Sequence, residues 1–485
     1  MNNEIANLTP KLLWENFCRL NEVPRPSKKE ERVIQFILDF AASLSLEAIQ
    51  DEIGNIVVKK PATKGLENRE TIVIQSHLDM VHQKNNDTIF DFDKEEIQMK
   101  IEGDWVKAKG TTLGADNGIG VATMMAILAS TNLPHPSIEA LFTIDEETGM
   151  TGAKHLDPKL LSGNILLNLD TEEDDEICIG CAGGVDITAT QQYDEATIAT
   201  EDKIGVHLNI KGLEGGHSGV DIHKGLGNAN KIINRILFNI SKKYQINVAS
   251  IEGGNLRNAI PRESEATIVI QKSDQEAFEE SCKTAIKIIQ EEQYNTDPNL
   301  LLEINFVEPK EKVLPQDIQT AILNTLMCAN NGVYRMSPDV EGLVETSNNI
   351  AKVSVSDGNA KIECLTRSSV TSSRIDLSNS LTSAFELGGF KVSLNGEYSG
   401  WKPNPDSKIL KVIQESYKKI NKEDAHVMAC HAGLECGIIG QHYPEMDMVS
   451  FGPTINGAHS PDERVSISSV QKYWKLVEEV LQNTP

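Results

Sequence analysis

Thr71-Ile-Val-Ile-Gln75 runs directly into Ser76-His-Leu-Asp-Met-Val81, and this junction sets the architecture of the first half of the chain. The β-branched run predicts a strand, and the residues after it begin a loop that carries His77 and Asp79. Residues two apart in extended chain project from one face, so these two side chains are expected to lie together. A carboxylate beside a metal-bound imidazole fixes the ring's tautomer, which favours Asp79 as the support of His77. Taken alone, the His-x-Asp pattern is equally typical of a solvated loop.

Helices and strands alternate around this junction. Ser27 and Glu30 have the spacing of a capping box, and the apolar period behind them predicts a helix over 28–44. A buried helix is expected over 117–130, and further strands over 55–59, 138–144 and 164–169. This alternation predicts an α/β fold with a mixed sheet.

The pattern changes at Gly183-Gly184. Residues 205–307 have the order strand, helix, strand, strand, helix, strand, which is typical of a ferredoxin-like α+β unit, and residues 316–394 repeat that order loosely. Helical periodicity returns over 408–420 and 466–482, with a strand over 446–451. If the histidine and carboxylates of the first domain need a partner from the last 90 residues, the middle block is an insertion. We then expect a catalytic domain formed by residues 1–185 plus 397–485, interrupted by an inserted lid or dimerisation domain over 186–396 that contains a doubled ferredoxin-like unit.

Four further segments carry metal-ligand side chains where a strand ends, a helix begins or a loop turns. They contribute Asp116, the pair Glu146 and Glu147, Asp170, and His459. Each has a plainer interpretation, such as a helix N-cap for Asp116 or an acidic turn for the glutamates. Together with His77 they form two ligand sets that share one carboxylate: His77, Asp116 and Asp170 for one ion, and Asp116, Glu147 and His459 for the other. Mixed histidine and carboxylate ligands favour two divalent ions, zinc first, with manganese or cobalt as alternatives.

Charge excludes other classes of function. The chain of 485 residues has 71 acidic and 46 basic side chains, so its net charge is 46 − 71 = −25. Nucleic-acid affinity depends on Lys and Arg contacts with phosphate, so neither nucleic acid nor an anionic membrane is an expected partner. No run approaches the roughly 20 apolar residues of a membrane span, and the N-terminus lacks the pattern of an export signal. The eight scattered cysteines are expected to be reduced, and the location to be cytoplasmic.

The ordered segments His77-Leu-Asp-Met-Val81, Gly114-Ala-Asp-Asn-Gly118, Asp145-Glu-Glu-Thr-Gly149, Leu169-Asp-Thr-Glu172 and Gly457-Ala-His-Ser-Pro461 resemble the two-metal exopeptidase and deacylase superfamily. Four more segments are similar to its aminoacyl-histidine dipeptidase branch, also called beta-alanyl-histidine dipeptidase or peptidase D. They are Gly180-Cys-Ala-Gly-Gly184, Gly212-Leu-Glu-Gly-Gly-His-Ser-Gly219, Asn258-Ala-Ile-Pro-Arg262 and His431-Ala-Gly-Leu-Glu-Cys-Gly437. The resemblance covers nearly the whole chain.

This resemblance implies a dipeptidase that cleaves Xaa-His and related dipeptides such as β-Ala-His. It implies attack by a water that bridges the two ions, with Glu146 as general base and Asp79 supporting His77. His77, Asp116, Glu147, Asp170 and His459 would be the metal ligands. From the lid, His217 and Asn258 would reach the substrate carbonyl, Arg367 would meet the terminal carboxylate, and Gly433 would line the pocket through its backbone.

Several alternatives stay open at this point. An N-acyl amino acid amidohydrolase of the same superfamily would share the metals and the base, and a catalytically silent metal-binding protein would share the metals alone. Arg374 stands close enough to Arg367 in the sequence to be the carboxylate partner instead. The sequence also leaves open the metal, the preferred dipeptides, the strictness for C-terminal His, and whether the chain is a monomer or a homodimer through the lid.

Overall fold

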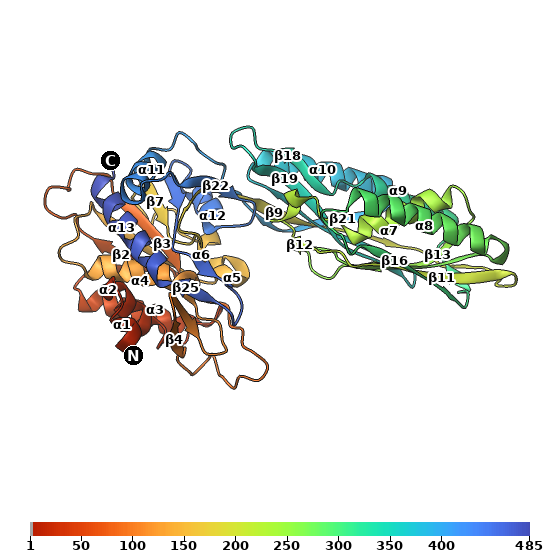
Figure 1. Ribbon diagram of the computed structural model, residues 1–485. Coiled ribbons are helices and arrows are strands. Elements are labelled where there is room, and N and C mark those ends of the chain that lie inside the picture. Colours follow the sequence, from red (N-terminus) through yellow and green to blue (C-terminus); the bar gives the residue numbers. More distant parts are fainter. Residues whose placement is uncertain (1–2) are drawn as a thin grey trace. The chain divides into compact units, whose positions relative to one another are not determined.

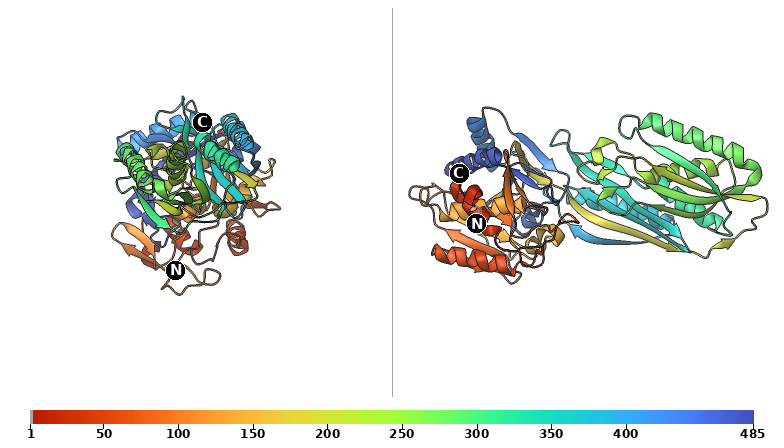
Figure 2. Two further views of the ribbon diagram at one scale, coloured as in Figure 1. Left: turned by 90° about the vertical axis from the view of Figure 1, so that its right-hand side faces the viewer. Right: turned by 60° about the horizontal axis from the view of Figure 1, so that its bottom comes forward.

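The computed structural model describes residues 3–485 and divides the chain into two compact units. The first unit runs to Gly180 and resumes over Trp401–Ala429 and Leu434–Pro485. The second unit comprises Cys181–Gly400 and the short segment Cys430–Gly433. Both ends of the chain belong to the first unit (Figures 1 and 2).

A mixed sheet forms the centre of the first unit. In spatial order its eight strands are β1 (Glu47–Gln50), β2 (Ile56–Lys60), β6 (Ile138–Thr143), β3 (Ile72–His77), β7 (Ile165–Asn168), β23 (Asp447–Ser450), β8 (Glu176–Cys181) and β22 (His426–Cys430). Strands β6, β3, β7 and β23 pair in parallel, whereas β2 pairs antiparallel with β1 and β6, and β8 pairs antiparallel with β23. Every residue of β3 and β6 is buried, as expected for parallel strands covered on both faces. The predicted α/β fold with a mixed sheet is confirmed.

Helices bury these strands. The apolar side chains of α3 (Glu31–Ser43), α4 (Ala115–Ala129), α11 (Lys408–Asn421) and α13 (Ile467–Asn483) share one core with the sheet. Helix α4 is apolar on all sides, and it is buried almost throughout. Helix α2 (Lys11–Leu20) packs against α4 in an adjoining core, next to the small sheet of β24 (Ile455–Asn456), β25 (Arg464–Ser466), β5 (Trp105–Ala108) and β4 (Met99–Glu102).

The predicted capping box at Ser27 is wrong. Helix α3 begins at Glu31, and no side chain caps its first turn. The hydroxyl of Ser27 instead donates to Oδ2 of Asp79 at 2.8 Å, and Oε1 of Glu30 accepts from the backbone N–H of Lys28 and of Asp145. Ser27 and Glu30 therefore bind residues of the loops that follow β3 and β6. The spacing of the two residues in the sequence did not indicate these contacts.

The second unit is built on a nine-stranded antiparallel sheet. Its spatial order is β16 (Leu301–Val307), β11 (Lys203–Lys211), β15 (Ser264–Gln271), β13 (Asn247–Gly253), β19 (Val344–Ser356), β20 (Asn359–Ser368), β9 (Gly183–Gln192) and β21 (Lys391–Tyr398), with β18 (Gly332–Met336) on β19. Strands β11, β13, β15 and β16, together with α7 (Ala229–Ser241) and α8 (Gln275–Glu292), follow the βαββαβ order.

The other half of this sheet follows the same order, but its first strand comes from far upstream. Strands β19, β20 and β21, with α9 (Gln316–Cys328) and α10 (Thr371–Leu387), are completed by β9, which pairs with both β20 and β21. The first βαββαβ unit is thus inserted between β9 and α9. The sequence pattern predicted a break at Gly183-Gly184 and no strand between it and residue 205, because the partners of β9 lie far along the chain.

The four long helices of this unit cover one face of the sheet (Figure 1). In β11 the alternate residues Val206, Leu208 and Ile210 are buried against that face, while His207 between them stays partly exposed. This alternation is typical of an antiparallel sheet with one covered face and one wet face. Within residues 3–485, no helix combines the length and the hydropathy needed to cross a bilayer.

Candidate functional site

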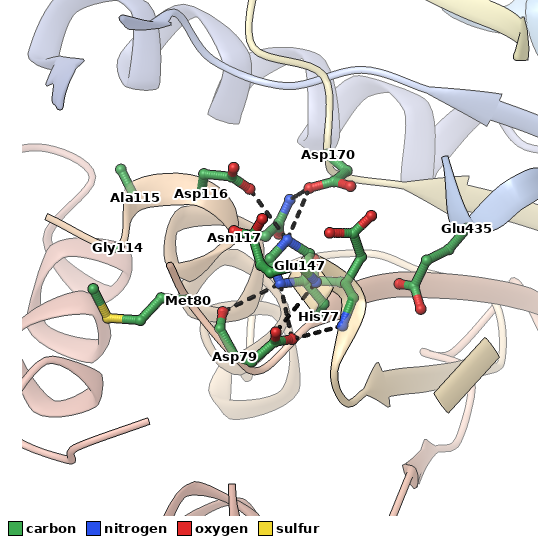
Figure 3. A network of polar contacts seen from close by, with 12 residues as sticks. His77, Asp79, Met80, Gly114, Ala115, Asp116, Asn117, Glu147, Asp170 and Glu435 are labelled. Carbon is green, nitrogen blue, oxygen red and sulfur yellow. Dashed lines mark hydrogen bonds and ion pairs between the residues drawn. The ribbon is translucent and has the colours of Figure 1, made fainter. Parts of the chain in front are cut away.

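Five segments of the first unit bring the predicted ligands together. His77 ends β3, Asp116 lies in the first turn of α4, and Glu147 lies in the short helix α5 (Glu146–Gly149) that follows β6. Asp170 follows β7, and His459 lies in the loop between β24 and β25. Because β3, β6 and β7 are parallel neighbours, the loops after their carboxyl ends meet at one edge of the sheet. Figure 3 shows His77 between Asp79 on one side and Asp116 and Asp170 on the other.

Asp116 faces both histidines with different oxygens. Its Oδ1 lies 3.1 Å from Nε2 of His77, and its Oδ2 lies 3.1 Å from Nε2 of His459. His77 Nε2 also lies 3.5 Å from Oδ1 of Asp170, and His459 Nε2 lies 3.0 Å from Oε2 of Glu147. The ligand atoms of His77, Asp116 and Asp170 all lie within 4.8 Å of one another, as do those of Asp116, Glu147 and His459.

The buried carboxylates of this cluster favour the binding of cations. Burial raises the pKa of both Glu147 and Asp170. Hydrogen bonds to Asp116 and Glu147 raise the pKa of His459 to about 11, and the neighbouring carboxylates raise that of His77 well above its ordinary value although burial opposes them. Oε1 of Glu147 is buried and has no hydrogen-bond partner in the described chain. An excess of buried acceptors with so few donors fits bound divalent ions.

Asp79 connects His77 to the turn that carries Glu146 and Glu147. Its Oδ1 lies 3.4 Å from Nδ1 of His77, and its buried carboxylate accepts the backbone N–H of Glu146 at 3.0 Å and of Glu147 at 3.3 Å. Burial would raise the pKa of Asp79, but the hydrogen bonds from His77 and Ser27 lower it overall. One carboxylate therefore orients an imidazole ring and the turn that carries both glutamates.

Glu146 lies beside the predicted ligands, and its side chain forms no hydrogen bond with them in the described structure. A carboxylate oxygen of Glu146 lies within 4.8 Å of ligand atoms of His77 and Glu147. Burial raises the pKa of Glu146 well above its ordinary value. The hydrogen bonds of the described residues include none to its side chain, so the carboxylate is available to a bound molecule.

Arg25 was not predicted as part of the site. Its guanidinium is buried, and it donates to the carbonyl oxygens of Leu78 at 3.1 Å, Asp79 at 3.2 Å and Gly114 at 2.6 Å. Burial lowers its pKa to about 10. The arginine thereby ties the loop after His77 to the turn before Asp116. The only sequence signal is an arginine between two prolines, Pro24 and Pro26.

Glu463 was also missed. Its carboxylate accepts hydrogen bonds from four successive backbone N–H groups, those of Leu113, Gly114, Ala115 and Asp116, at 2.6 to 3.2 Å. Burial raises its pKa to about 7. Because Glu463 lies four residues after His459, it connects the loop of one predicted ligand, His459, to the backbone of another, Asp116. No local pattern distinguishes this acidic residue from its exposed neighbours.

Glu435 stands inside the quoted segment His431–Gly437 but was given no role. It is fully buried, and its Oε2 accepts from Nε2 of Gln75 at 2.6 Å and from Oγ1 of Thr143 at 2.7 Å. Burial raises its pKa to about 7. Figure 3 shows Glu435 on the side of the cluster where Glu147 lies. It is an additional buried acid next to the strands that carry the ligands.

The predicted lid residues gather within the second unit. His217 pairs with Ala259 in the ladder of β12 (Gly216–His217) and β14 (Ala259–Ile260), which places Asn258 next to it. A Cβ at Gly219 would lie 2.1 Å from the carbonyl oxygen of His431 and 3.2 Å from Nε of Arg367 and Cε1 of His217. The side chains of His217 and Arg367 and the backbone of His431 therefore meet at a glycine that admits no side chain. Gly433 lies two residues beyond His431.

The protonation of His217 is set by its own loop. Its Nδ1 accepts the backbone N–H of Gly219 at 3.2 Å and of Val220 at 3.0 Å. Burial and the charge of Arg367 lower its pKa. The neutral ring must therefore carry its proton on Nε2, which leaves one N–H to donate.

Arg367 and Arg374 differ in their partners. Arg374 is buried, pairs with the carboxylate of Glu397, and donates to the carbonyl oxygens of Gly184 at 2.7 Å and Tyr398 at 3.0 Å. Arg367 is 5% exposed, donates to the hydroxyl of Tyr398 at 2.8 Å, and has no carboxylate within 4.0 Å among the described residues. Its buried Nε has no acceptor there either. Arg367 is thus the guanidinium that can receive an anion.

Comparisons with known proteins cover most or all of the chain. The model of peptidase family M20/M25/M40 matches residues 73–483. The cytosol non-specific dipeptidase of Escherichia coli (strain K12) is 42% identical over 483 residues, which cover 100% of this chain and 99% of that protein.

Solved structures show the same fold. The crystal structure of aminoacylhistidine dipeptidase from Vibrio alginolyticus is 42% identical, covers 100% of this chain and 99% of that chain, and superposes with a TM-score of 0.95. Aminopeptidase PepT from Bacillus cereus, at 17% identity and a TM-score of 0.57 over 98% of both chains, shares the fold. The family match and the full-length relatives lead to one conclusion: the chain belongs to peptidase family M20/M25/M40.

Proposed function

We propose that this protein is a metal-dependent dipeptidase that hydrolyses Xaa-His and related dipeptides such as β-Ala-His. The observation that carries the proposal is the position of Asp116, whose two oxygens each lie 3.1 Å from Nε2 of a different histidine. A carboxylate shared by two ligand sets is the arrangement that a two-metal hydrolase needs. The two full-length relatives at 42% identity, both named dipeptidases, support the reaction class.

His77, Asp116 and Asp170 would hold one divalent ion, and Asp116, Glu147 and His459 the other. Imidazole and carboxylate donors favour zinc, with manganese and cobalt as the alternatives to test. When bound, such ions polarise the scissile carbonyl and lower the pKa of water toward about 7.

Glu146 is the proposed general base. It accepts the proton of the attacking water and passes it to the leaving amine, a contribution of typically 10²- to 10⁴-fold in rate. Its side chain lies next to His77 and Glu147 and has no competing hydrogen bond in the described chain. Asp79 contributes by orienting the ring of His77 and by holding the backbone of Glu146.

Residues of the second unit would bind the substrate. Arg367 receives its terminal carboxylate, because this guanidinium is buried without a counter-ion while Arg374 is paired with Glu397. His217 donates from Nε2 to the substrate carbonyl, and Asn258 and Gly433 bind beside it. In these terms residues 1–185 plus 397–485 form the catalytic domain, and residues 186–396 form the lid.

The cytoplasm is the proposed location, in line with the word cytosol in the name of the E. coli relative. A homodimer through the lid stays a prediction. Light scattering of the purified protein distinguishes it from a monomer.

The test is a substrate panel on chelated protein. Activity toward β-Ala-His, other Xaa-His dipeptides and unrelated dipeptides is measured after zinc, manganese or cobalt is restored in turn, with N-acetyl amino acids as the competing class. Hydrolysis of dipeptides only after metal is restored is the expected result. Preferential cleavage of N-acetyl amino acids would instead indicate an amidohydrolase, and absence of turnover with both ions bound would indicate a silent metal-binding protein.

A further inference from the structure

Arg367 and Tyr398 lie on strands that are not neighbours. Arg367 is near the end of β20 and Tyr398 ends β21, and β9 runs between them. Gly184 of β9 pairs with Arg367 on one side and with Tyr398 on the other. Directly paired residues project from the same face of a sheet, so the two side chains stand on either side of the glycine.

The missing side chain of Gly184 makes room for the tyrosine ring. A Cβ at this position would lie 2.6 Å from the hydroxyl oxygen of Tyr398 and 2.7 Å from its Cε1 and Cζ atoms. Because nothing occupies that space, the ring crosses β9, and its hydroxyl accepts a hydrogen bond of 2.8 Å from Nη1 of Arg367. This contact gives a physical reason for a glycine in the segment Gly180–Gly184.

The backbone on which this contact depends is held separately. The buried guanidinium of Arg374 donates to the carbonyl oxygens of both Gly184 and Tyr398, and its charge is balanced by Glu397. Arg374 therefore fixes the two strands, and neither Arg367 nor the hydroxyl of Tyr398 is needed for that purpose.

Arg367 and Tyr398 each have a hydrogen-bond donor that finds no acceptor among the described residues. The hydroxyl oxygen of Tyr398 already accepts from Arg367, and its proton has no acceptor among residues 3–485. Burial raises the pKa of this phenol, so the hydroxyl keeps its proton. Nε of Arg367 is likewise buried without an acceptor in the described structure. Burial raises the pKa of Asp186 although Arg257 and Arg367 oppose that rise, and the carboxylate of Asp186 pairs with Arg257 at 3.5 Å and not with Arg367.

We propose that Tyr398 is a substrate-binding residue whose hydroxyl donates to the terminal carboxylate of the dipeptide, next to Arg367. The inference rests on the proposed function, which assigns that carboxylate to Arg367. A carboxylate accepts from a guanidinium and a phenol together, whereas a neutral terminal amide replaces one of the two acceptor oxygens by a donor. The pair therefore selects peptides with a free C-terminus.

The test compares β-Ala-His with its C-terminal amide on the Tyr398→Phe variant. We expect KM for the free dipeptide to rise about 10-fold, the loss typical of a hydrogen bond to a charged group, with kcat nearly unchanged. The affinity for the amide, measured as a competitive inhibition constant where turnover is slow, should change less than about 2-fold. A KM within about 2-fold of wild type for the free dipeptide, or equal losses for both ligands, overturns the role of Tyr398.

Tyr193→Phe is the matched control, because Tyr193 belongs to the same unit and its hydroxyl is buried but, unlike that of Tyr398, has no hydrogen-bond partner in the described chain. It should leave both constants unchanged. Gly184→Ala should reproduce the Tyr398→Phe phenotype, since the added methyl group displaces the ring. A folded Gly184→Ala protein with wild-type KM would contradict the part given to the glycine.

Arg367→Ala separates this inference from the proposed function. If Arg367→Ala does not change the preference for the free dipeptide over the amide, the assignment of the carboxylate to Arg367 fails, and the inference fails with it. If Arg367→Ala abolishes the preference and Tyr398→Phe preserves it, only the inference fails.

Discussion

Oδ1 of Asp79 accepts a hydrogen bond of 3.0 Å from the backbone N–H of Glu146. The two residues come from loops after different strands, β3 and β6, and the bond fixes the distance between those loops. Oδ2 of the same carboxylate accepts from Ser27 at 2.8 Å, so the acid is anchored on both oxygens. The turn that presents the proposed base is therefore placed by the residue that orients His77.

Glu146→Gln should keep both metal ions and lose at least about 100-fold in kcat, because the amide cannot accept the proton of the attacking water. Steady-state kinetics on β-Ala-His and elemental analysis of dialysed protein check the two halves of this prediction. Glu173→Gln, an exposed acidic position in the loop after Asp170, is the control and should behave like wild type. Turnover close to normal in Glu146→Gln would assign the base to another residue.

His459→Ala should lose one of two ions. His459 supplies one of three ligand side chains to the set that contains Asp116 and Glu147, whereas the set around His77 keeps all of its members. The metal content measured by elemental analysis should therefore fall from two ions per chain toward one, and the activity should fall with it. His426→Ala, whose side chain is 76% exposed and pairs only with Asp175 in the structure described, serves as the control. Two ions per chain in His459→Ala would show that this histidine is not a ligand.

The clustering of the proposed ligands was predictable because several of them belong to local patterns. His77 ends an apolar strand, Asp170 follows another, and Asp116 lies in the first turn of an apolar helix. A strand end or helix start can be recognised in the sequence, and in α/β sheets such positions gather at one edge. The fold of the first unit followed from the same periodicity.

The residues that hold these ligands could not be found in that way. Arg25 and Glu463 bind backbone groups, which carry no sequence signal, and Glu463 reaches N–H groups about 350 positions away. Strand β9 was missed for a related reason, since its partners β20 and β21 lie far along the chain. Ser27 and Glu30 were misassigned because a capping box looks the same when Asp79 and the loop backbone supply better partners.

His431 should make the protein sensitive to acid. Burial, followed by the charge of Arg367, lowers its pKa to about 3, and Nε2 lies 2.8 Å from the hydroxyl of Ser347. Below the ordinary histidine pKa of about 6.5 the unfolded chain binds a proton that the folded chain does not, so the free energy of unfolding falls as pH falls from about 6.5 toward 3. The slope reaches about 1.4 kcal/mol per pH unit.

Replacing His431 by a residue that does not titrate tests this prediction. His431→Gln should flatten the decrease in the free energy of unfolding between pH 6.5 and 5, measured by urea denaturation with metal held constant. His207→Gln, at a partly exposed histidine of β11 in the same unit, should keep the wild-type slope. Identical slopes in wild type and His431→Gln would show that His431 is not kept neutral by the fold.

Glu463→Gln tests whether the loop of His459 and the backbone of Asp116 must be fastened together. The carboxylate offers acceptors to four N–H groups, and an amide nitrogen in place of one oxygen would face two of those donors. Buried donors left without an acceptor cost about 1 to 3 kcal/mol in the free energy of unfolding. Because Asp116 is the proposed shared ligand, metal affinity should fall about 10-fold or more, as is typical when the support of a ligand is removed. Chelator competition measures that affinity, and the exposed Glu423→Gln is the control. Wild-type affinity and stability in Glu463→Gln would mean that the turn at Asp116 holds its shape without this carboxylate.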